Sequence, residues 1–177
     1  MPSTTDYIQQ PDPLPVLQQI PNFWWIAANQ KHWMWETLFT NPYQGEFFHK
    51  RKILDNFNYA KPGDVVFGYQ SSPEKKMVAL AVVCRSLYYN WKLEHYRKDP
   101  YGIDILGFGQ SMLQFPVEWT LLKIAIPNSE PVRCNSQGTL FRLTPSEALG
   151  IARLLRKAGN KLEFPESLQV VEEYLHQ

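Results

Sequence analysis

Residues 61–83 read KPGDVVFGYQSSPEKKMVALAVV, a Pro-Gly turn followed by two apolar runs. Its Pro-Gly pair is typical of a type II turn, because proline presets the first central φ and glycine accepts the positive φ at the second. Two apolar runs with strong strand character follow, Val65–Tyr69 and Met77–Cys84, with Ser71–Lys76 between them. The stretch therefore predicts a buried β-hairpin.

Shorter patterns extend the fold on both sides of this hairpin. Phe23–Ala27 predicts a strand, and Lys31–Phe39 a short helix or turn. Downstream, Trp119–Ile126 and Gly138–Leu143 predict two more strands, which brings the number of expected strands to five. Several short strands with few helices predict an α+β fold, built as a mixed β-barrel with helices packed outside.

The clearest helix is predicted between Thr144 and Ala158. Thr144 and Glu147 have the spacing of a capping box, Pro145 occupies the first helical position, and apolar residues recur at helical spacing up to Gly159. A final helix, about Glu166 to His176, follows Pro165 without a stop signal. We therefore expect the native chain to continue into a further domain.

Three regions follow from these patterns. Residues 1–21 contain five prolines and no sustained period, so they predict an extended arm. Residues 22–160 form the expected domain, and 161–177 the C-terminal helix. Inside the domain, residues 85–114 mix Tyr and Trp with Lys and Arg and lose apolar alternation. They predict a long loop, which its aromatic content marks as functional rather than disordered.

Composition excludes several classes of protein. Lys and Arg number 18 against 17 Asp and Glu, so the net charge of +1 gives no whole-molecule attraction to nucleic acid or anionic membranes. Cys84 and Cys134 are too few and too far apart for a disulfide framework or zinc site, which predicts reduced thiols. The N-terminus lacks a signal core and no apolar run spans a membrane, so a cytoplasmic location is expected.

Signatures of catalysis are missing from the sequence. It has no Gly-rich phosphate loop with Lys-Ser/Thr, no His-Glu-x-x-His, no Cys-x-x-Cys and no Gly-x-Ser-x-Gly. Gly107 and Gly109 supply two glycines of a dinucleotide fingerprint, but Met112 takes the third place. The four histidines are scattered. A binding module without catalytic residues, metal or cofactor is the prediction.

An aromatic cluster brackets two carboxamides near the start of the domain. Phe23, Trp24, Trp25, Trp33 and Trp35 surround a stretch whose strongly hydrogen-bonding side chains are Asn29 and Gln30. Aromatic faces stack on nucleobases, and carboxamides pair with their edges, so this composition suits a pocket for a flat ligand. The alternative is that the tryptophans are core residues.

The motifs NFWWIAANQ, GEFFHKRK and the 61–83 hairpin, in this order, resemble EVE domains and their YTH relatives, which are PUA-like barrels that read modified nucleobases. WTLLKIAIPNSEPV and GTLFRLTPSEALGIARLL resemble their late strand, turn and closing helix, so the likeness spans about Asn22 to Gly159. The resemblance implies a PUA-like mixed β-barrel. The WW-x-x-x-NQ start is most similar to the N-terminal specificity modules of McrBC-type, modification-dependent restriction systems.

The resemblance also implies the site. Asn29 falls where the family places a carboxamide on the base edge, Phe47 or Phe48 at one wall of an aromatic cage, and Trp91 at the opposite wall. Phe108 or Leu113 falls at the rim. Trp33 replaces a second Asn of some YTH members, which implies a base other than their adenine. The expected base-binding set is Trp25, Asn29, Gln30, Trp33, Phe47, Phe48, Tyr69, Trp91 and Phe108.

The resemblance implies the partners as well: duplex DNA with a methylated base flipped into the cage, a GTPase motor and a nuclease subunit. Phosphate contacts are expected from local basic residues, with a solvated surface as the alternative for each. These residues are Lys50, Arg51, Lys75, Lys76 and Arg97, with Lys52 and Lys98 beside them. An RNA-base or small-ligand binder on the same barrel, or a hydrolase or transferase, stays open as another class of function.

Overall fold

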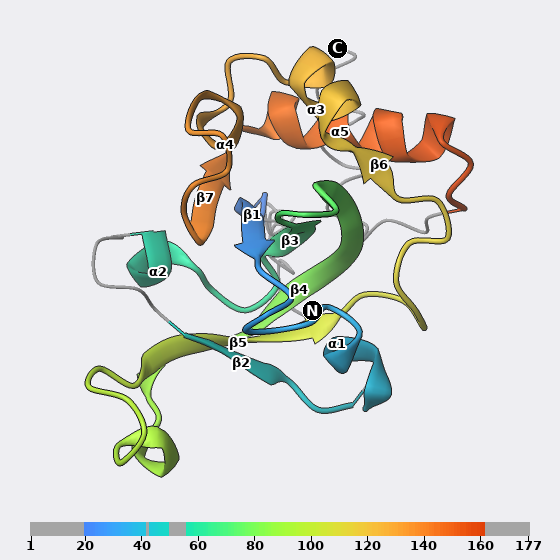
Figure 1. The fold of residues 1–177 in the computed structure, drawn as a ribbon. Helices are drawn as coiled ribbons and strands as arrows, with labels where there is room; N and C mark the ends of the chain where they lie inside the picture. The colour runs from blue at the N-terminus through green and yellow to red at the C-terminus, as the bar shows by residue number, and fades with distance from the viewer. Residues whose placement is uncertain (1–19, 42, 50–55, 162–177) are drawn as a thin grey trace, which may run out of the picture.

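The computed structural model describes residues 20–41, 43–49 and 56–161. Within these ranges a seven-stranded mixed sheet has the order β2-β5-β4-β3-β1-β7, with β6 paired to β4 (Figure 1). The strands are β1 (Phe23–Ala28), β2 (Glu46–His49), β3 (Val65–Gln70), β4 (Lys76–Tyr89), β5 (Tyr101–Gly107), β6 (Val117–Glu118) and β7 (Leu140–Leu143). The predicted α+β class is confirmed.

Short helices surround this curved sheet. The helices α3 and α5 lie together over one end of it (Figure 1), and α1 and α2 contribute Leu38 and Phe57 to the apolar cluster that does not include α5. They are α1 (Thr37–Thr40), α2 (Asn56–Tyr59), the 3₁₀ turn η1 (Trp91–Leu93), α3 (Trp119–Ala125), α4 (Glu130–Arg133) and α5 (Pro145–Lys157). The expected C-terminal helix, and the arm up to residue 19, lie outside the described residues.

The predicted hairpin is confirmed as β3 and β4, and β1 runs parallel to β3. Its entry turn has Gly63 at φ +91° and a hydrogen bond of 3.1 Å from Asp64 N to Lys61 O. The Asp64 carboxylate is fully buried and accepts Trp24 Nε1 at 2.8 Å. The turn therefore also anchors β1 against the hairpin.

The predicted long loop over 85–114 is wrong for residues 85–89 and 101–107, which lie in β4 and β5. β4 continues through Cys84 to Tyr89, and its second half pairs with β5, which also pairs with β2. This half of β4 is exposed or half-buried and carries polar residues, so it shows no apolar run in the sequence. Its strand conformation comes from the non-local ladder, whereas the tip between β4 and β5 and residues 108–114 form no strand.

The predicted strand over Trp119–Ile126 is also wrong, because Trp119–Ala125 forms helix α3. Leu122 and Ile126 are buried, and Trp119 packs against the same core, so the inward positions follow helical spacing. Leu121 and Ile124 are exposed. An apolar run of this length cannot be assigned to strand or helix by periodicity alone.

Two apolar clusters cover opposite faces of the sheet. Trp25 belongs to the cluster that Ile151 and Leu155 of α5 complete, and Trp24 belongs to the other. Helix α5 packs on the sheet through these two residues, and its predicted capping box is confirmed, with Glu147 N donating to Thr144 Oγ1 at 3.2 Å. Successive strand residues point to opposite faces, so the two tryptophans are separated.

Candidate nucleic-acid interface

A cavity of about 250 Å³ opens where β1 ends beside β2. Four predicted base-binding residues, Asn29, Trp33, Phe47 and Phe48, line it together with Arg97 from the predicted phosphate-binding set. Sequence reasoning did not include the remaining lining residues, which are Ala27, Ala28, His32, His49 and Thr139. The small side chains Ala27 and Ala28, directly before Asn29, are the signal that could have located the space.

Asn29 is held by the turn that follows β1. Its Oδ1 accepts Lys31 N at 2.9 Å, and its carbonyl oxygen accepts the backbone N–H groups of His32 and Trp33. An Asn side chain that bonds the backbone two residues on is a common turn device. Across the described ranges no protein acceptor pairs with Asn29 Nδ2. This NH₂ group is therefore available to an acceptor on a ligand.

The aromatic walls are supported from behind. The Trp33 ring makes edge contacts with Trp35 at 4.8 Å and with Phe48 at 5.7 Å between ring centroids. Phe48 in turn stacks on Phe57 at 6.3 Å with 6° between the rings. Since Trp35, Phe48 and Phe57 are buried, the Trp33 and Phe48 rings keep their positions when the cavity is empty.

The position of the Phe47 ring requires a glycine at residue 102 in the neighbouring strand β5. A Cβ on Gly102 would lie 2.6 Å from the Phe47 ring, so the ring occupies the space that the missing side chain leaves. The other edge of Phe47 contacts Tyr88 at 5.5 Å. Asp104 accepts the Tyr88 hydroxyl at 2.7 Å, and burial is the first cause that raises the pKa of Tyr88 to about 12, with this hydrogen bond second.

Arg97 reaches the cavity from the segment between β4 and β5. The His49 ring nitrogen bonds the backbone oxygen of Asp99, which fastens this segment to β2 next to the cavity. A guanidinium at the mouth of an aromatic pocket suits a phosphate group of a bound nucleotide.

Trp25 and Tyr69 do not line the cavity. Both are buried in the core on the opposite face of the sheet, with ring centroids 4.8 Å apart, and Trp25 Nε1 donates to Ser136 Oγ at 3.0 Å. Burial, with a smaller effect of Glu118, raises the pKa of Tyr69 to about 12. For Trp25 the structure therefore favours the core alternative over the pocket.

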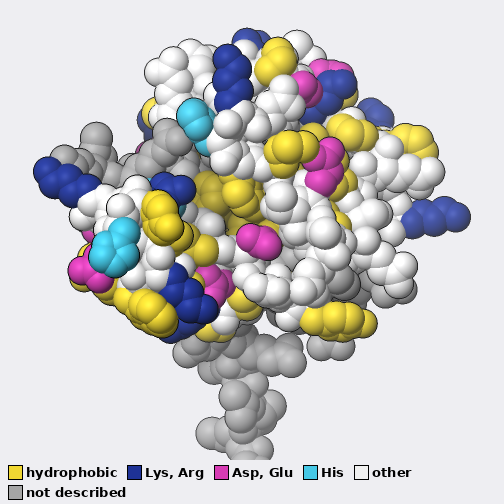
Figure 2. Space-filling model, turned by 60° about the horizontal axis from the view of Figure 1, so that its bottom comes forward, with side chains coloured by type: hydrophobic (Ala, Val, Ile, Leu, Met, Phe, Trp, Pro, Cys, Tyr) yellow, Lys and Arg dark blue, Asp and Glu magenta, His cyan; other side chains and the backbone are white. Residues whose placement is uncertain are grey.

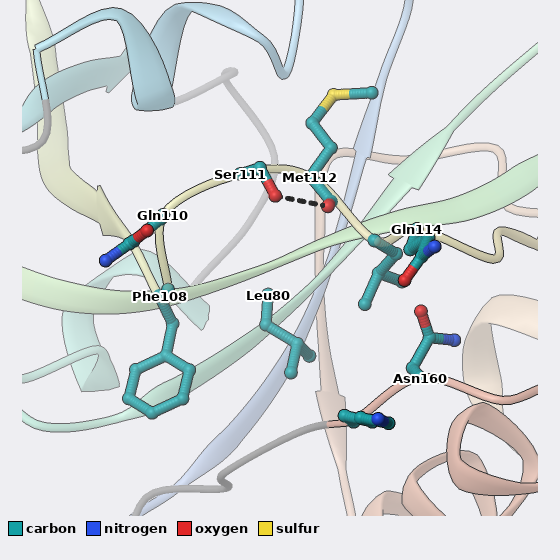
Figure 3. Close-up of a pocket in the computed structure, with 10 residues that line it drawn as sticks. Leu80, Phe108, Gln110, Ser111, Met112, Gln114 and Asn160 are labelled. Atoms are coloured by element: carbon teal, nitrogen blue, oxygen red, sulfur yellow. Dashed lines mark hydrogen bonds between the residues drawn. The ribbon is translucent and has the colours of Figure 1, made fainter.

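Three other predicted base-binding residues also lie elsewhere. Gln30 is exposed and donates to Glu74 Oε1 at 3.0 Å. Trp91, expected as the opposite wall, is 68% exposed on η1 and is not among the cavity's lining residues. Phe108, with the alternative rim residue Leu113, lines a separate cavity of about 410 Å³ near Asn160 (Figure 3).

The other described members of the predicted phosphate-binding set do not line the cavity. Lys75 and Lys76 lie at the β3–β4 turn, where Lys76 pairs with Glu118 at 3.1 Å. Lys50 and Arg51 lie outside the described residues. Both cysteines are free thiols, as predicted. In the described part of the chain no three His, Cys, Asp or Glu side chains group as metal ligands, and no helix is long and apolar enough to cross a membrane.

Comparison with known proteins bears on the fold. No family model and no curated protein matches the chain. Among solved structures, protein Atu2648 from Agrobacterium tumefaciens is 20% identical with a TM-score of 0.64, over 78% of this chain and 94% of its own. The DUF55 domain of human thymocyte nuclear protein 1 is 13% identical with a TM-score of 0.62, over 75% and 98%.

A third similar structure contains DNA. It is the human THYN1 protein in complex with DNA containing 5-methylcytosine, 14% identical with a TM-score of 0.59, over 80% of this chain and 99% of that one. These likenesses confirm the PUA-like fold that the resemblance implied. The narrower resemblance to McrBC-type specificity modules stays a prediction.

Proposed function

We propose that the protein binds DNA containing a modified nucleobase and reads that base in the Asn29 cavity. One observation carries this proposal. At the end of β1, the packed rings of Trp33 and Phe48 and the unpaired NH₂ group of Asn29 line the same cavity. The cavity, about 250 Å³, is smaller than the roughly 300–1,000 Å³ of sites for drug-sized ligands, which suits a single base. A protein of the same fold is seen with 5-methylcytosine DNA.

Base flipping is the mechanism we infer. A base inside a duplex presents neither face to a protein, so it has to leave the stack to enter an aromatic pocket. Trp33 and Phe48 then contact the faces of the base, while Asn29 Nδ2 donates to an acceptor on its edge. Arg97 contacts a neighbouring phosphate. The protein acts as a binding module, and the restriction role places a GTPase motor and a nuclease on other domains or subunits.

The free energies of base extrusion, stacking and methyl burial limit how much the cavity contributes to binding affinity. Extrusion of a base costs a few kcal/mol, and each stacking contact recovers about 1–3 kcal/mol. One buried methyl group adds roughly 0.8 kcal/mol, about fourfold in affinity. Larger discrimination requires that the unmodified base leaves a polar group in the pocket unpaired.

The proposal is tested by titrating methylated and unmethylated duplexes at several salt concentrations. We expect affinity to fall with a log-log slope of about −2 to −4, equal for both duplexes, because the cavity acts on the base and the basic residues act on phosphates. The methylated duplex should bind more tightly at every salt concentration. Equal affinity throughout would reject the reader function.

Asn29→Asp sharpens this test. Aspartate keeps the Oδ1 acceptor for Lys31 N, so the turn persists, but the NH₂ donor toward the ligand is lost. We expect affinity for the methylated duplex to drop about tenfold or more, with an unchanged melting curve. Gln44→Glu is the matched control, since it adds the same charge at an exposed residue outside the cavity and keeps the oxygen that accepts Asn41 Nδ2. Equal losses in both variants would indicate simple repulsion of DNA.

A further inference from the structure

The tip of the β4–β5 hairpin, residues 89–101, is an exposed aromatic surface. Trp91 is 68% exposed and Tyr96 is 83% exposed, and Tyr89 and Tyr101 at its base are also exposed. The tip projects from the sheet at the end away from α3 and α5 (Figure 1). Large exposed rings gathered on one segment mark an interaction site.

Cations accompany these rings. The segment carries three exposed basic residues, Lys92, Arg97 and Lys98. It also carries two acidic residues, Glu94 and Asp99. The Lys92 ammonium lies 5.9 Å from the centre of the Trp91 ring. Figure 2 shows hydrophobic, basic, acidic and histidine side chains together on the lobe at its lower left. Aromatic rings interleaved with Lys and Arg fit nucleic acid, whose bases stack and whose phosphates are anionic.

The tip is an ordered structure. Asn90 N donates to Pro100 O at 2.8 Å, and Asn90 Oδ1 accepts Lys92 N at 3.3 Å at the start of η1. The N–H groups of Tyr96 and Arg97 both donate to Leu93 O at 2.9 Å. Since the backbone is already fixed, binding through the Trp91 ring orders few additional groups.

The tip is continuous with the cavity. Arg97 belongs to both, and the contact of the His49 ring with Asp99 O joins the base of the tip to β2. A nucleotide held in the cavity therefore places its flanking phosphates and its former stacking neighbours beside the tip. Trp91 itself is outside the cavity, so it is available to those neighbours.

We propose that this tip is the wedge that keeps the duplex open. Trp91 stacks in the space that the extruded base leaves, and Lys92 and Lys98 bind the adjoining phosphates. This inference rests on the proposed reader function and assigns Trp91 a role on the opened duplex rather than at a wall of the base cavity. Stacking of this kind tolerates any flanking sequence, because every base has a π face.

A comparison of two DNA substrates tests the wedge. One is a duplex with a single 5-methylcytosine, and the other is the same modified strand alone, which needs no opening. Trp91→Ala should weaken duplex binding by roughly 5- to 150-fold and single-strand binding by less than about twofold. Because Trp91 is exposed, the melting curve should stay unchanged. Ile124→Ala, at a 76% exposed residue on α3, is the control and should alter neither affinity.

The outcomes separate the two proposals. Equal wild-type affinity for methylated and unmethylated duplexes overturns the reader function. If the wild type discriminates but Trp91→Ala keeps its duplex affinity, only the wedge is overturned. The wedge is also overturned if both substrates lose affinity equally, because that result describes a plain stacking contact. Replacement of Lys92 and Lys98 together by Gln should make the salt slope on duplex shallower by about 2.

Discussion

Replacement of Asp64 by Ala should destabilise the whole domain. The Asp64 carboxylate is fully buried and accepts four hydrogen bonds. Oδ2 takes Trp24 Nε1 at 2.8 Å, Asn22 Nδ2 at 3.0 Å and Lys61 N at 3.0 Å, and Oδ1 takes Asn22 N at 2.9 Å. These bonds join the start of β1 to the turn before β3.

The loss in free energy of unfolding depends on which of the four donor groups can bond to water once the Asp64 carboxylate is removed. Trp24 is fully buried, so its unpaired indole N–H costs about 1–3 kcal/mol. The Asn22 and Lys61 groups lie nearer the surface and recover water, so each lost bond costs about 0.5–1.5 kcal/mol. We expect a loss of about 3–5 kcal/mol in the free energy of unfolding, or roughly 6–20 °C in Tm at this chain length.

Asp64→Asn provides a graded comparison. Its amide oxygen can take the place of Oδ2 and keep three donors, but its NH₂ group then faces the Asn22 N–H, donor against donor. Urea unfolding followed by tryptophan fluorescence should rank the wild type above Asp64→Asn, and Asp64→Ala last. Glu36→Ala, at an exposed carboxylate, is the control. A loss below about 1 kcal/mol in Asp64→Ala would show that the buried Trp24 N–H does not depend on this carboxylate.

Three further changes test other parts of the structure. Burial and Glu118 raise the pKa of Tyr69 to about 12, so the folded state retains the phenol proton above the unfolded pKa near 10. The contribution of Tyr69 to stability should be level below pH 10 and fall by roughly 2–3 kcal/mol as the pH rises to 12, and Tyr69→Phe should remove this contribution in urea unfolding at pH 8 to 12. Gly68→Ala places a Cβ 2.8 Å from the buried Trp35 ring, so we expect a loss of about 1–3 kcal/mol and weaker binding of modified DNA, measured by unfolding and titration. Thr144→Ala removes the α5 cap and should cost about 0.5–2 kcal/mol in unfolding without changing DNA affinity, whereas altered affinity would connect α5 to the site.

Elements with local signals were predictable from the sequence. The β3–β4 hairpin has its Pro-Gly turn, and α5 has its capping box next to a helical apolar stripe. In both cases the residues that determine the structure lie within a few positions of one another. Their physical effect does not depend on the rest of the fold.

Elements created by non-local pairing were not predictable. The second half of β4 pairs with β5, as in Arg85 opposite Asp104, and its exposed polar side chains give no apolar alternation. β2 is a short edge strand whose partner is more than fifty residues away along the chain. Such strands depend on ladder hydrogen bonds that a sequence window does not contain.

Part of the candidate site was predictable for a different reason. The order of the motifs around Asn29 and Phe47–Phe48 resembles that of EVE domains, and the structure brings these residues together with Trp33. The order of the motifs does not show which face of β1 packs against α5. It therefore could not predict that Trp25 lies in the core and not in the cavity. Only the alternation along β1, together with the position of α5, decides this.

Different parts of the structure should determine the affinity for DNA and the discrimination between modified and unmodified bases. Extrusion of a base costs a few kcal/mol, while a methyl group adds roughly 0.8 kcal/mol, so the cavity can favour a modified base without binding DNA tightly by itself. The net charge of +1 supplies no long-range attraction. Stacking by Trp91 and phosphate contacts from the tip act on any opened duplex, whichever base was extruded. Affinity should therefore depend chiefly on the tip and discrimination on Asn29 and its aromatic neighbours, so that combined Trp91→Ala and Asn29→Asp changes add in free energy.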